Sequence, residues 1–236
     1  MLNKSRRQVQ TAVLLVIAAV SADVHAADLN GYALLTTDYV RRGVTQSDSS
    51  GAVQLGVELA LDSGLYFGVW GSTVDIHNGP DQHRDLESNY YIGFTYDVAR
   101  RWTVGANVVS YRYPGADTYF DYDYIEYSLN ANFDDRIWIE YAYSPDLYDS
   151  GEETHNLEIS SEWAIAGHWS LSAGLGYYDP SALTGSAYSY WQTGVTRRFD
   201  RIDVDLRYHD SSRSIPIVST PDRAKARVAL SIRFPF

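Results

Sequence analysis

The feature that most constrains this chain is a strict alternation of apolar and polar residues, repeated along most of its length after residue 28. In segment 52–62, for example, Val53 and Leu55 share one face, whereas Gln54 and Gly56 share the other. A period of two is the signature of a β-strand, because successive side chains of a strand point to opposite faces. Several segments approach the ~9–11 residues that a tilted strand needs to cross a bilayer. Strands of soluble domains usually run to about 5–6 residues.

The alternation divides the chain into twelve expected strands. A helical period of about 3.6 residues is not evident in any of them. The strands are expected at 29–40, 52–62, 65–73, 86–97, 102–113, 118–133, 136–143, 154–166, 169–178, 187–199, 202–210 and 224–236. An even number of strands is typical of single-chain bacterial outer-membrane barrels.

The connections between these strands alternate in length as well. Short ones follow the even strands, at 62–64, 98–101, 134–135, 167–168 and 200–201. Longer polar ones follow the odd strands, at 41–51, 74–85, 144–153, 179–186 and 211–223, with a brief 114–115 turn after the fifth strand. This pattern predicts an all-β fold, a closed antiparallel transmembrane β-barrel of about 12 strands with short periplasmic turns and longer extracellular loops. The alternative is a secreted sandwich or lipocalin-like barrel, which does not account for the regular loop lengths.

The first 26 residues have the pattern of a secretory signal peptide. Basic residues at 4–7 precede an apolar run at 11–20, and residues 24–26 (VHA) fit a small-residue cleavage site. An N-terminal anchor helix is the alternative, but the apolar run is too short to span a bilayer. We therefore expect a signal peptide at 1–26, cleaved near Ala26, and an exported barrel domain at 27–236.

Composition removes several classes of function. The chain has no Cys, so thiolate metal sites, disulfides and Cys nucleophiles are excluded. A mean hydropathy of −0.29 and the lack of ~18 consecutive apolar residues exclude a bundle of membrane helices. The net charge of −11 argues against nucleic acid as a partner, since binding to nucleic acid rests on neutralising phosphates. We expect no cofactor.

Aromatic residues make up 14% of the chain and cluster near the ends of the expected strands. Amphipathic rings concentrate at the lipid–water boundary, so we interpret them as two girdles in contact with outer-membrane lipid. The expected girdle residues are Tyr32, Tyr39, Tyr66, Trp70, Tyr90, Tyr96, Trp102, Tyr111, Tyr143, Trp169, Tyr177 and Tyr208. The alternative for Tyr119, Tyr122 and Tyr124, which lie toward the loop side, is a platform on which sugars stack.

The last strand carries a sharp short signal. Val228, Leu230, Ile232, Phe234 and Phe236 alternate up to a terminal aromatic residue. This pattern looks like the assembly signal of outer-membrane barrels, so the barrel-assembly machinery is an expected partner of the Phe236 strand. A plain edge strand with this sequence would invite aggregation unless the sheet closes.

Charged residues fall mostly on the polar face of the strands, which in a membrane barrel faces a wet lumen. Acidic residues dominate the second to eighth strands, and basic residues gather on the last two. Barrel closure places the last strand beside the first, so Arg42, Arg207, Lys225 and Arg227 are expected together near the extracellular mouth. The expected pore-lining residues are Asp38, Arg42, Glu58, Glu87, Glu126, Glu140, Glu158, Glu162, Arg207, Lys225, Arg227 and Arg233. An acidic wall facing a basic patch would select small solutes by charge. The alternative is a set of inward ion pairs that plug the barrel.

Catalysis is a weaker hypothesis. The chain has no Gly-x-Ser-x-Gly elbow. The candidate pairs for a lipid hydrolase are His155 with Ser161, and His168 with Ser170 or Ser172. His155 and Ser161 share a face but lie roughly 20 Å apart along the strand. We therefore do not expect an enzyme.

A metal site in the loop after the third strand is also disfavoured. His77, Asp81, His83 and Asp85 lie close together in the sequence. They form no compact frame of oxygen ligands such as an EF-hand, so a solvated acidic loop is the simpler interpretation.

Several motifs resemble those of the TorF family of proteobacterial porins, and together they cover almost the whole mature chain. Residues 36–46 (TTDYVRRGVTQ) resemble the opening motif of that family, and residues 64–72 (GLYFGVWGS) resemble its second block. Residues 90–93 and 111–115 are similar to its later landmarks. Arg41 departs from the family pattern, where an aromatic residue is more usual. The resemblance implies a barrel and a porin role, without a substrate.

Together these observations predict a bacterial outer-membrane channel for passive diffusion of small polar or charged solutes. The alternatives are a plugged structural or adhesin-like barrel and an outer-membrane lipid hydrolase.

Overall fold

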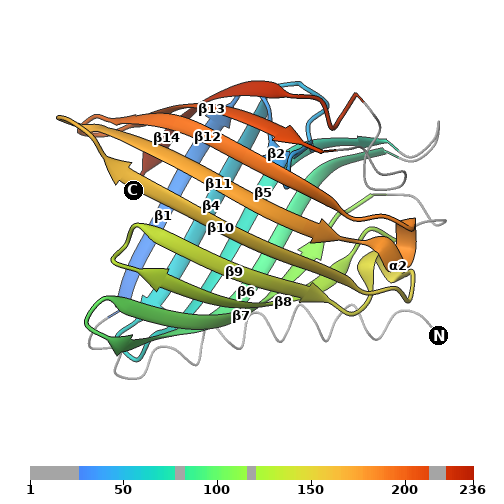
Figure 1. Cartoon of the computed structure of the whole chain (residues 1–236), viewed down its shortest axis with the longest axis horizontal. Helices are drawn as coiled ribbons and strands as arrows, with labels where there is room; N and C mark the ends of the chain where they lie inside the picture. The colour runs from blue at the N-terminus through green and yellow to red at the C-terminus, as the bar shows by residue number, and fades with distance from the viewer. Residues whose placement is uncertain (1–26, 78–82, 116–120, 213–221) are drawn as a thin grey trace.

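The computed structural model describes residues 27–77, 83–115, 121–212 and 222–236. The expected signal peptide lies outside these residues. The described chain forms a closed barrel of twelve tilted antiparallel strands (Figure 1). The barrel strands are β1 (Ala27–Thr36), β4 (Ala52–Leu61), β5 (Leu65–His77), β6 (His83–Ala99), β7 (Trp102–Arg112), β8 (Tyr124–Phe133), β9 (Ile137–Ser144), β10 (Thr154–Ala164), β11 (Trp169–Asp179), β12 (Tyr188–Arg198), β13 (Asp203–Ser211) and β14 (Arg227–Pro235).

Helical structure is limited to two short pieces in the described residues, both in loops. These are a 3₁₀ turn, η1 (Leu147–Asp149), and α2 (Ser181–Thr184). No helix in the described part of the chain is long and apolar enough to cross a membrane.

The barrel closes where the first and last strands pair. β1 and β14 are antiparallel, with Tyr32 opposite Pro235 and Thr36 opposite Ser231. The terminal residue extends this pairing, because Gly31 and Phe236 exchange two backbone N–H···O hydrogen bonds of 2.9 Å each. The Phe236 ring also lies directly against Gly31, where a Cβ atom would clash. The C-terminal aromatic residue is therefore part of the closure and leaves no free edge.

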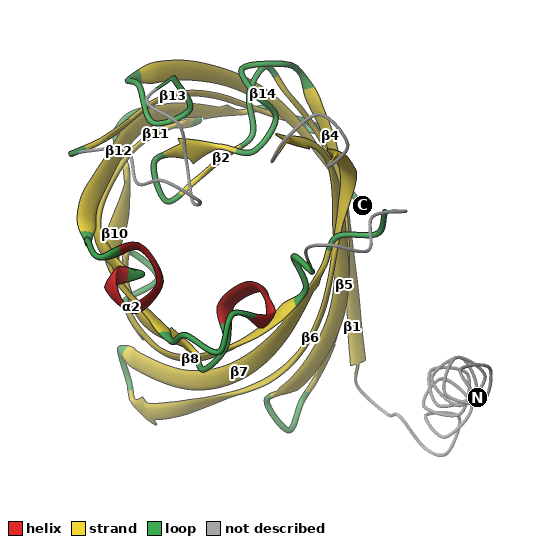
Figure 2. Cartoon of the chain, turned by 90° about the vertical axis from the view of Figure 1, so that its right-hand side faces the viewer, coloured by secondary structure: helices red, strands yellow, loops and turns green. Residues whose placement is uncertain are grey.

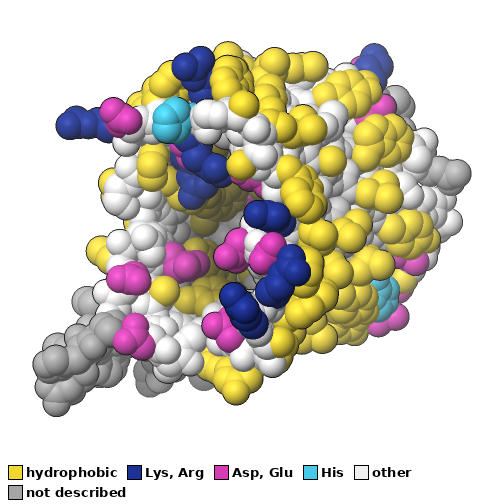
Figure 3. Space-filling model, turned by 60° about the vertical axis from the view of Figure 1, so that its left-hand side comes forward, with side chains coloured by type: hydrophobic (Ala, Val, Ile, Leu, Met, Phe, Trp, Pro, Cys, Tyr) yellow, Lys and Arg dark blue, Asp and Glu magenta, His cyan; other side chains and the backbone are white. Residues whose placement is uncertain are grey.

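The two faces of the wall have inverted polarity relative to a soluble protein. Large apolar side chains such as Leu29, Leu129 and Leu175 are exposed on the outer face, whereas Ser72 and Asn156 point inward and are buried. Figure 3 shows apolar side chains covering the outer surface and charged side chains around the hollow at the short-turn end. An apolar outer band around a polar interior is the arrangement of a barrel that lies in lipid.

The short turns of one rim have tight-hairpin geometry. Asp134 and Asp135 connect β8 to β9 with φ values of 59° and 53°, and Gly64 between β4 and β5 has a φ of 88°. Two consecutive residues with positive φ match the type I′ turn, whose twist suits two-residue hairpins. The prediction of short connections on this rim is confirmed.

Several strand boundaries differ from those expected, and three of the differences affect the lumen and the loops. β1 ends at Thr36 rather than at residue 40, because the chain turns into the barrel there. β8 begins at Tyr124 rather than at residue 118, so the predicted brief turn at 114–115 is wrong and a longer connection replaces it. β14 begins at Arg227, which leaves Lys225 in the preceding turn instead of on the strand.

The predicted aromatic girdles are only partly right. Tyr90, Tyr96, Trp102, Trp169, Tyr177 and Tyr208 are exposed on the outer face, as expected. By the alternation of the strands, Tyr32, Tyr66, Trp70 and Tyr111 instead face the lumen, and Tyr39 follows β1 in the chain that enters it. The sequence shows that rings lie near strand ends, but a shift of one residue decides which face they occupy.

Candidate functional site in the barrel lumen

A small hairpin enters the barrel after β1. It consists of β2 (Val40–Arg41) and β3 (Val44–Thr45), which pair Val40 with Thr45 and Arg41 with Val44. Figure 2 shows β2 inside the ring formed by the barrel strands. The turn residues Arg42 and Gly43 have φ values of 50° and 76°, as a type I′ turn requires. The hairpin therefore holds two arginines at its tip inside the lumen.

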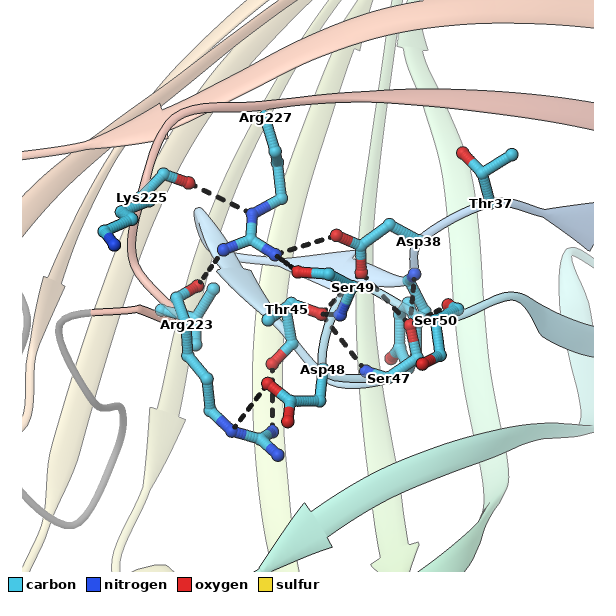
Figure 4. Close-up of polar contacts among 12 residues, drawn as sticks. Thr37, Asp38, Thr45, Ser47, Asp48, Ser49, Ser50, Arg223, Lys225 and Arg227 are labelled. Carbon is cyan, nitrogen blue, oxygen red and sulfur yellow. Dashed lines mark hydrogen bonds and ion pairs between the residues drawn. The ribbon is translucent and has the colours of Figure 1, made fainter.

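Asp38 anchors the base of this hairpin (Figure 4). Its Oδ1 atom accepts hydrogen bonds from the hydroxyls of Thr45, at 2.5 Å, and Ser47, at 3.1 Å. Its Oδ2 atom accepts one from Arg227 Nη1 of β14 at 2.8 Å. Because Asp38 and Arg227 are both buried, this charge-assisted bond fixes the hairpin to the wall.

The turn before β14 holds the same hairpin from the other side. The backbone N–H of Thr45 donates to the carbonyl of Arg223 at 3.1 Å. The Arg223 guanidinium donates in turn to the carbonyls of Thr45, at 3.4 Å, and Asp75. Arg227 Nη2 donates to the Arg223 carbonyl at 2.7 Å, which links the two arginines into one clamp (Figure 4).

Apolar packing completes the attachment. Val44 is 2% exposed and packs in a cluster with Tyr178, Tyr188, Tyr190 and Ala224. Thr45 beside it is fully buried. Segments with many buried contacts and few exposed hydrogen bonds have high local stability, so we expect the hairpin to be ordered rather than a mobile loop.

The tip of the hairpin reaches the wall on the far side of the barrel. Arg42 Nη2 lies 2.8 Å from Glu126 Oε2 of β8, and Arg41 Nη2 lies 3.4 Å from Glu126 Oε1. Burial has the largest single effect and lowers the pKa of Arg42, but the Glu126 carboxylate and the neighbouring Tyr178 and Tyr124 together hold that pKa above its ordinary value. Both arginines therefore stay charged, and their positive charges compensate the negative charge of Glu126, which is only 4% exposed.

Tyrosine rings surround these arginines. The Arg41 guanidinium lies 4.3 Å from the ring centre of Tyr111, and the Arg42 guanidinium lies 4.8 Å from that of Tyr178. Arg41 also donates to the Tyr124 hydroxyl, and the rings of Tyr111 and Tyr124 stack at 4.4 Å. A guanidinium over an aromatic face gains cation–π energy, most of all where water is excluded. Arg41 is thus held within an aromatic cluster.

Glu87 of β6 is fully buried on the same side of the lumen. Its carboxylate accepts hydrogen bonds from Asn89 Nδ2 at 2.9 Å and from the Tyr39 hydroxyl at 3.4 Å.

The alternative of a platform on which sugars stack involves Tyr119, Tyr122 and Tyr124. Tyr122 and Tyr124 are buried among other tyrosines, and Tyr119 lies outside the described residues. Tyr122 and Tyr124 therefore offer no accessible face for a sugar.

Two cavities meet the hairpin within the lumen. One of about 370 Å³ extends from Asp38 to Glu162, Arg198 and Asp203, close to the short-turn rim. The other, of about 240 Å³, lies beside Arg41 and Arg42 against the β8–β12 wall. Val40 and His209 border both cavities. Both cavities therefore border the hairpin, and charged side chains line the space next to it.

The acidic residues of the predicted pore lining are distributed along this space. Glu140 and Glu158 stand opposite each other on β9 and β10, and both line the smaller cavity. Glu158 accepts a hydrogen bond from the Tyr190 hydroxyl at 2.8 Å, whereas no hydrogen bond or salt bridge reaches Glu140 from the described residues. Glu162 pairs with Arg198 at 2.5 Å, and Glu58 accepts from the Tyr91 hydroxyl at 3.1 Å.

Four of the five predicted basic residues are paired with a carboxylate. Arg207 is paired with Asp205 at 3.0 Å, Lys225 with Asp222 at 2.5 Å, and Arg42 and Arg227 with Glu126 and Asp38. Arg233 lies over the Tyr32 ring at 4.1 Å. The order of the strands predicted a separate basic patch, whereas the structure places these basic side chains next to acidic ones. Arg42 in particular crosses the lumen on the hairpin, because it does not belong to β1.

The candidate catalytic pairs are not brought together. His155 faces outward, where its Nδ1 atom lies 2.7 Å from the Tyr141 hydroxyl, and Ser161 is six residues further along β10. Ser170 and Ser172 are buried on the inward face of β11, and His168 lies in the turn before that strand. Of the residues considered for a metal site in the loop after the third strand, Asp81 lies outside the described residues. No group of three or more metal-ligating side chains occurs among the described residues.

Sequence reasoning missed the inward hairpin. Residues 41–51 were expected to form an extracellular loop, yet Val40–Thr45 carries the signs of a hairpin: alternating valines around Arg42-Gly43. The same residues form the core of the motif that resembles the TorF family. A family-like motif within an expected loop indicates that the loop has a role of its own, and this was the feature from which the hairpin could have been predicted.

Residues 24–232 match a family of bacterial proteins of unknown function, Gcw_chp, and the chain belongs to this family. The resemblance to the TorF family remains a prediction. No curated protein matches the chain significantly.

Solved porins share the fold. The chain resembles the NanC porin with a TM-score of 0.57 at 10% identity, over 89% of this chain and 99% of NanC. It resembles the KdgM porin with a TM-score of 0.53 at 7% identity, over the same shares of the two chains. KdgM has also been solved in complex with disordered oligogalacturonate. At these identities the likeness concerns the fold: a closed twelve-stranded barrel of the porin type.

Proposed function

We propose that the protein is an outer-membrane channel for the passive diffusion of small polar or charged solutes. The observation that carries this proposal is a twelve-stranded barrel with an apolar outer face and hydrophilic, charge-lined cavities in its lumen. Side chains fill barrels of about eight strands, whereas barrels of 16–18 strands leave open channels. Twelve strands give an intermediate lumen, in which one inward loop decides the width.

In this proposal the hairpin is the constriction of the path. Solutes pass beside the Arg41–Arg42 tip and then along the cavities bordered by Glu140, Glu158 and Arg207. Rings of charged side chains at a constriction set which ions pass. Because Glu140 has no salt-bridge partner among the described residues, we expect a preference for cations.

The remaining predicted lining residues make the lumen polar, but most of their charged groups are already engaged in contacts within the protein. Glu58, Glu87, Glu126 and Glu162 accept hydrogen bonds within the wall, and Lys225 lies at the rim. KdgM, solved in complex with disordered oligogalacturonate, supports the idea that a barrel of this fold admits a sugar oligomer.

A plugged structural or adhesin-like barrel is the second candidate. It is favoured by the depth at which the hairpin is anchored, with Val44 and Thr45 buried and Asp38 bound to Arg227. Channel and plug differ in one property, which is whether ions cross when the hairpin is in place.

Planar-bilayer recording distinguishes the two candidates. The refolded wild-type protein is compared with a variant in which residues 40–45 are replaced by a Gly-Ser linker that cannot reach β8. A channel gives discrete steps in both proteins, with larger steps in the variant. Silence of the wild type together with steps in the variant would establish the plug instead.

We further propose the route to the membrane. Residues 1–26 act as a signal peptide cleaved near Ala26, and the barrel-assembly machinery recognises the strand that ends at Phe236. Outer-membrane lipid then surrounds the apolar band. Mass spectrometry of the protein purified from outer membranes tests the cleavage, since the expected N-terminus is Ala27.

A further inference from the structure

Two lumen-facing tyrosines on neighbouring strands lie against glycines. Tyr91 of β6 is paired with Gly68 of β5, and Tyr66 of β5 is paired with Gly93 of β6. Each ring approaches its glycine so closely that a Cβ atom there would clash with it. Each ring tip therefore lies close to the backbone of the neighbouring strand, and both tyrosines are partly exposed.

Polar groups hold and flank these rings. The Tyr91 hydroxyl donates to Glu58 Oε2 at 3.1 Å, which fixes the ring across β5. The centres of the two rings are 6.2 Å apart and their planes are inclined at 60°, so the two rings are in edge-to-face contact. Asn107 of β7 stands opposite Gly93, and its Oδ1 atom is buried without a hydrogen-bond partner among the described residues.

We propose that Tyr66 and Tyr91, together with Glu58 and Asn107, bind sugar rings that carry no acidic group. This inference rests on the proposed channel function and names a class of solute for it. A pyranose has an apolar C–H face that packs on an aromatic ring, and hydroxyls at its edge that need hydrogen-bond partners. An aromatic surface bordered by a carboxylate and an amide supplies both kinds of contact.

The charges around this surface disfavour acidic sugars. Glu58 contacts the aromatic pair directly, and a uronic acid would place a second carboxylate beside it. The guanidinium of Arg233 lies 4.1 Å from the ring centre of Tyr32, another lumen-facing tyrosine.

Calorimetric titration of maltohexaose into the refolded protein in detergent micelles tests the site. Tyr66→Ala and Tyr91→Ala should each weaken binding about tenfold, which corresponds to the loss of one aromatic contact. Tyr90→Ala is the matched control, because Tyr90 is the neighbour of Tyr91 on β6 but points outward. Loss of binding in the two lumen variants alone supports the site. Absence of binding by the folded wild type, or equal binding by all variants, overturns it.

Hexagalacturonic acid tests the expected discrimination against acidic sugars. It should bind the wild type at least about tenfold more weakly than maltohexaose, and Glu58→Gln should narrow that difference. Preference for the acidic sugar overturns the proposal. Bilayer recordings on the same samples separate this site from the channel: sugar binding without conductance refutes the channel alone, and conductance without sugar binding refutes the site alone.

Discussion

Replacing Arg42 by Gln should destabilise the barrel measurably. The variant removes the 2.8 Å contact with Glu126, whose carboxylate is buried in the wall of β8. Breaking a buried ion pair by removing one partner costs about 3–5 kcal/mol, because the remaining charge is left without compensation. Arg41 stays at 3.4 Å from Glu126, so we expect a loss of about 3 kcal/mol, at the lower end of that range.

A double-mutant cycle isolates the pair. Arg42→Gln, Glu126→Gln and the double variant are unfolded with guanidinium in detergent micelles, followed by tryptophan fluorescence. The double variant should lose less than the sum of the single variants, with a coupling energy of about 1–3 kcal/mol. The exposed pair of Arg101 and Asp134 on the opposite rim is the matched control and should show no measurable coupling. Additive losses at Arg42 and Glu126 would refute the view that the hairpin tip is bound to the far wall.

Other variants test separate parts of the molecule. Glu140→Gln should lower the cation-to-anion permeability ratio, measured as a reversal potential under a salt gradient, and an unchanged ratio would mean that Glu140 does not line the path. Asp135→Gly should stabilise the barrel by about 0.5 kcal/mol against guanidinium, because glycine adopts the positive φ of 53° without strain; destabilisation would contradict the type I′ assignment. Deleting Phe236 should reduce the yield of folded barrel on heat-modifiability gels, because it removes the two hydrogen bonds to Gly31, and full assembly would show that closure does not need it.

The barrel itself could be predicted because its physical signal is local and repeated. Val53 and Leu55 are exposed and Gln54 is buried, as alternation in a membrane barrel requires. The pairing of Asp134 with Asp135 in a tight turn also follows from neighbours in the sequence. Features determined by adjacent residues are those that a period of two can show.

The arrangement of the lumen could not be predicted, since it depends on contacts between distant residues. Arg42 and Glu126 are 84 residues apart, and Asp38 and Arg227 are 189 apart. Alternation assigns each side chain to the inner face but does not show which loop enters the barrel. Tyr66 illustrates the same limit: its position near a strand end suggested a girdle, whereas its register against Gly93 places it in the lumen.

The most direct test of the central claim compares the single-channel conductance of the wild type with that of the variant in which a Gly-Ser linker replaces residues 40–45. If the lumen is a solute path narrowed by β2 and β3, the wild type shows small discrete steps and the variant shows larger ones. Equal steps in the two proteins would contradict the role of the hairpin, and silence in both would contradict a channel through this barrel.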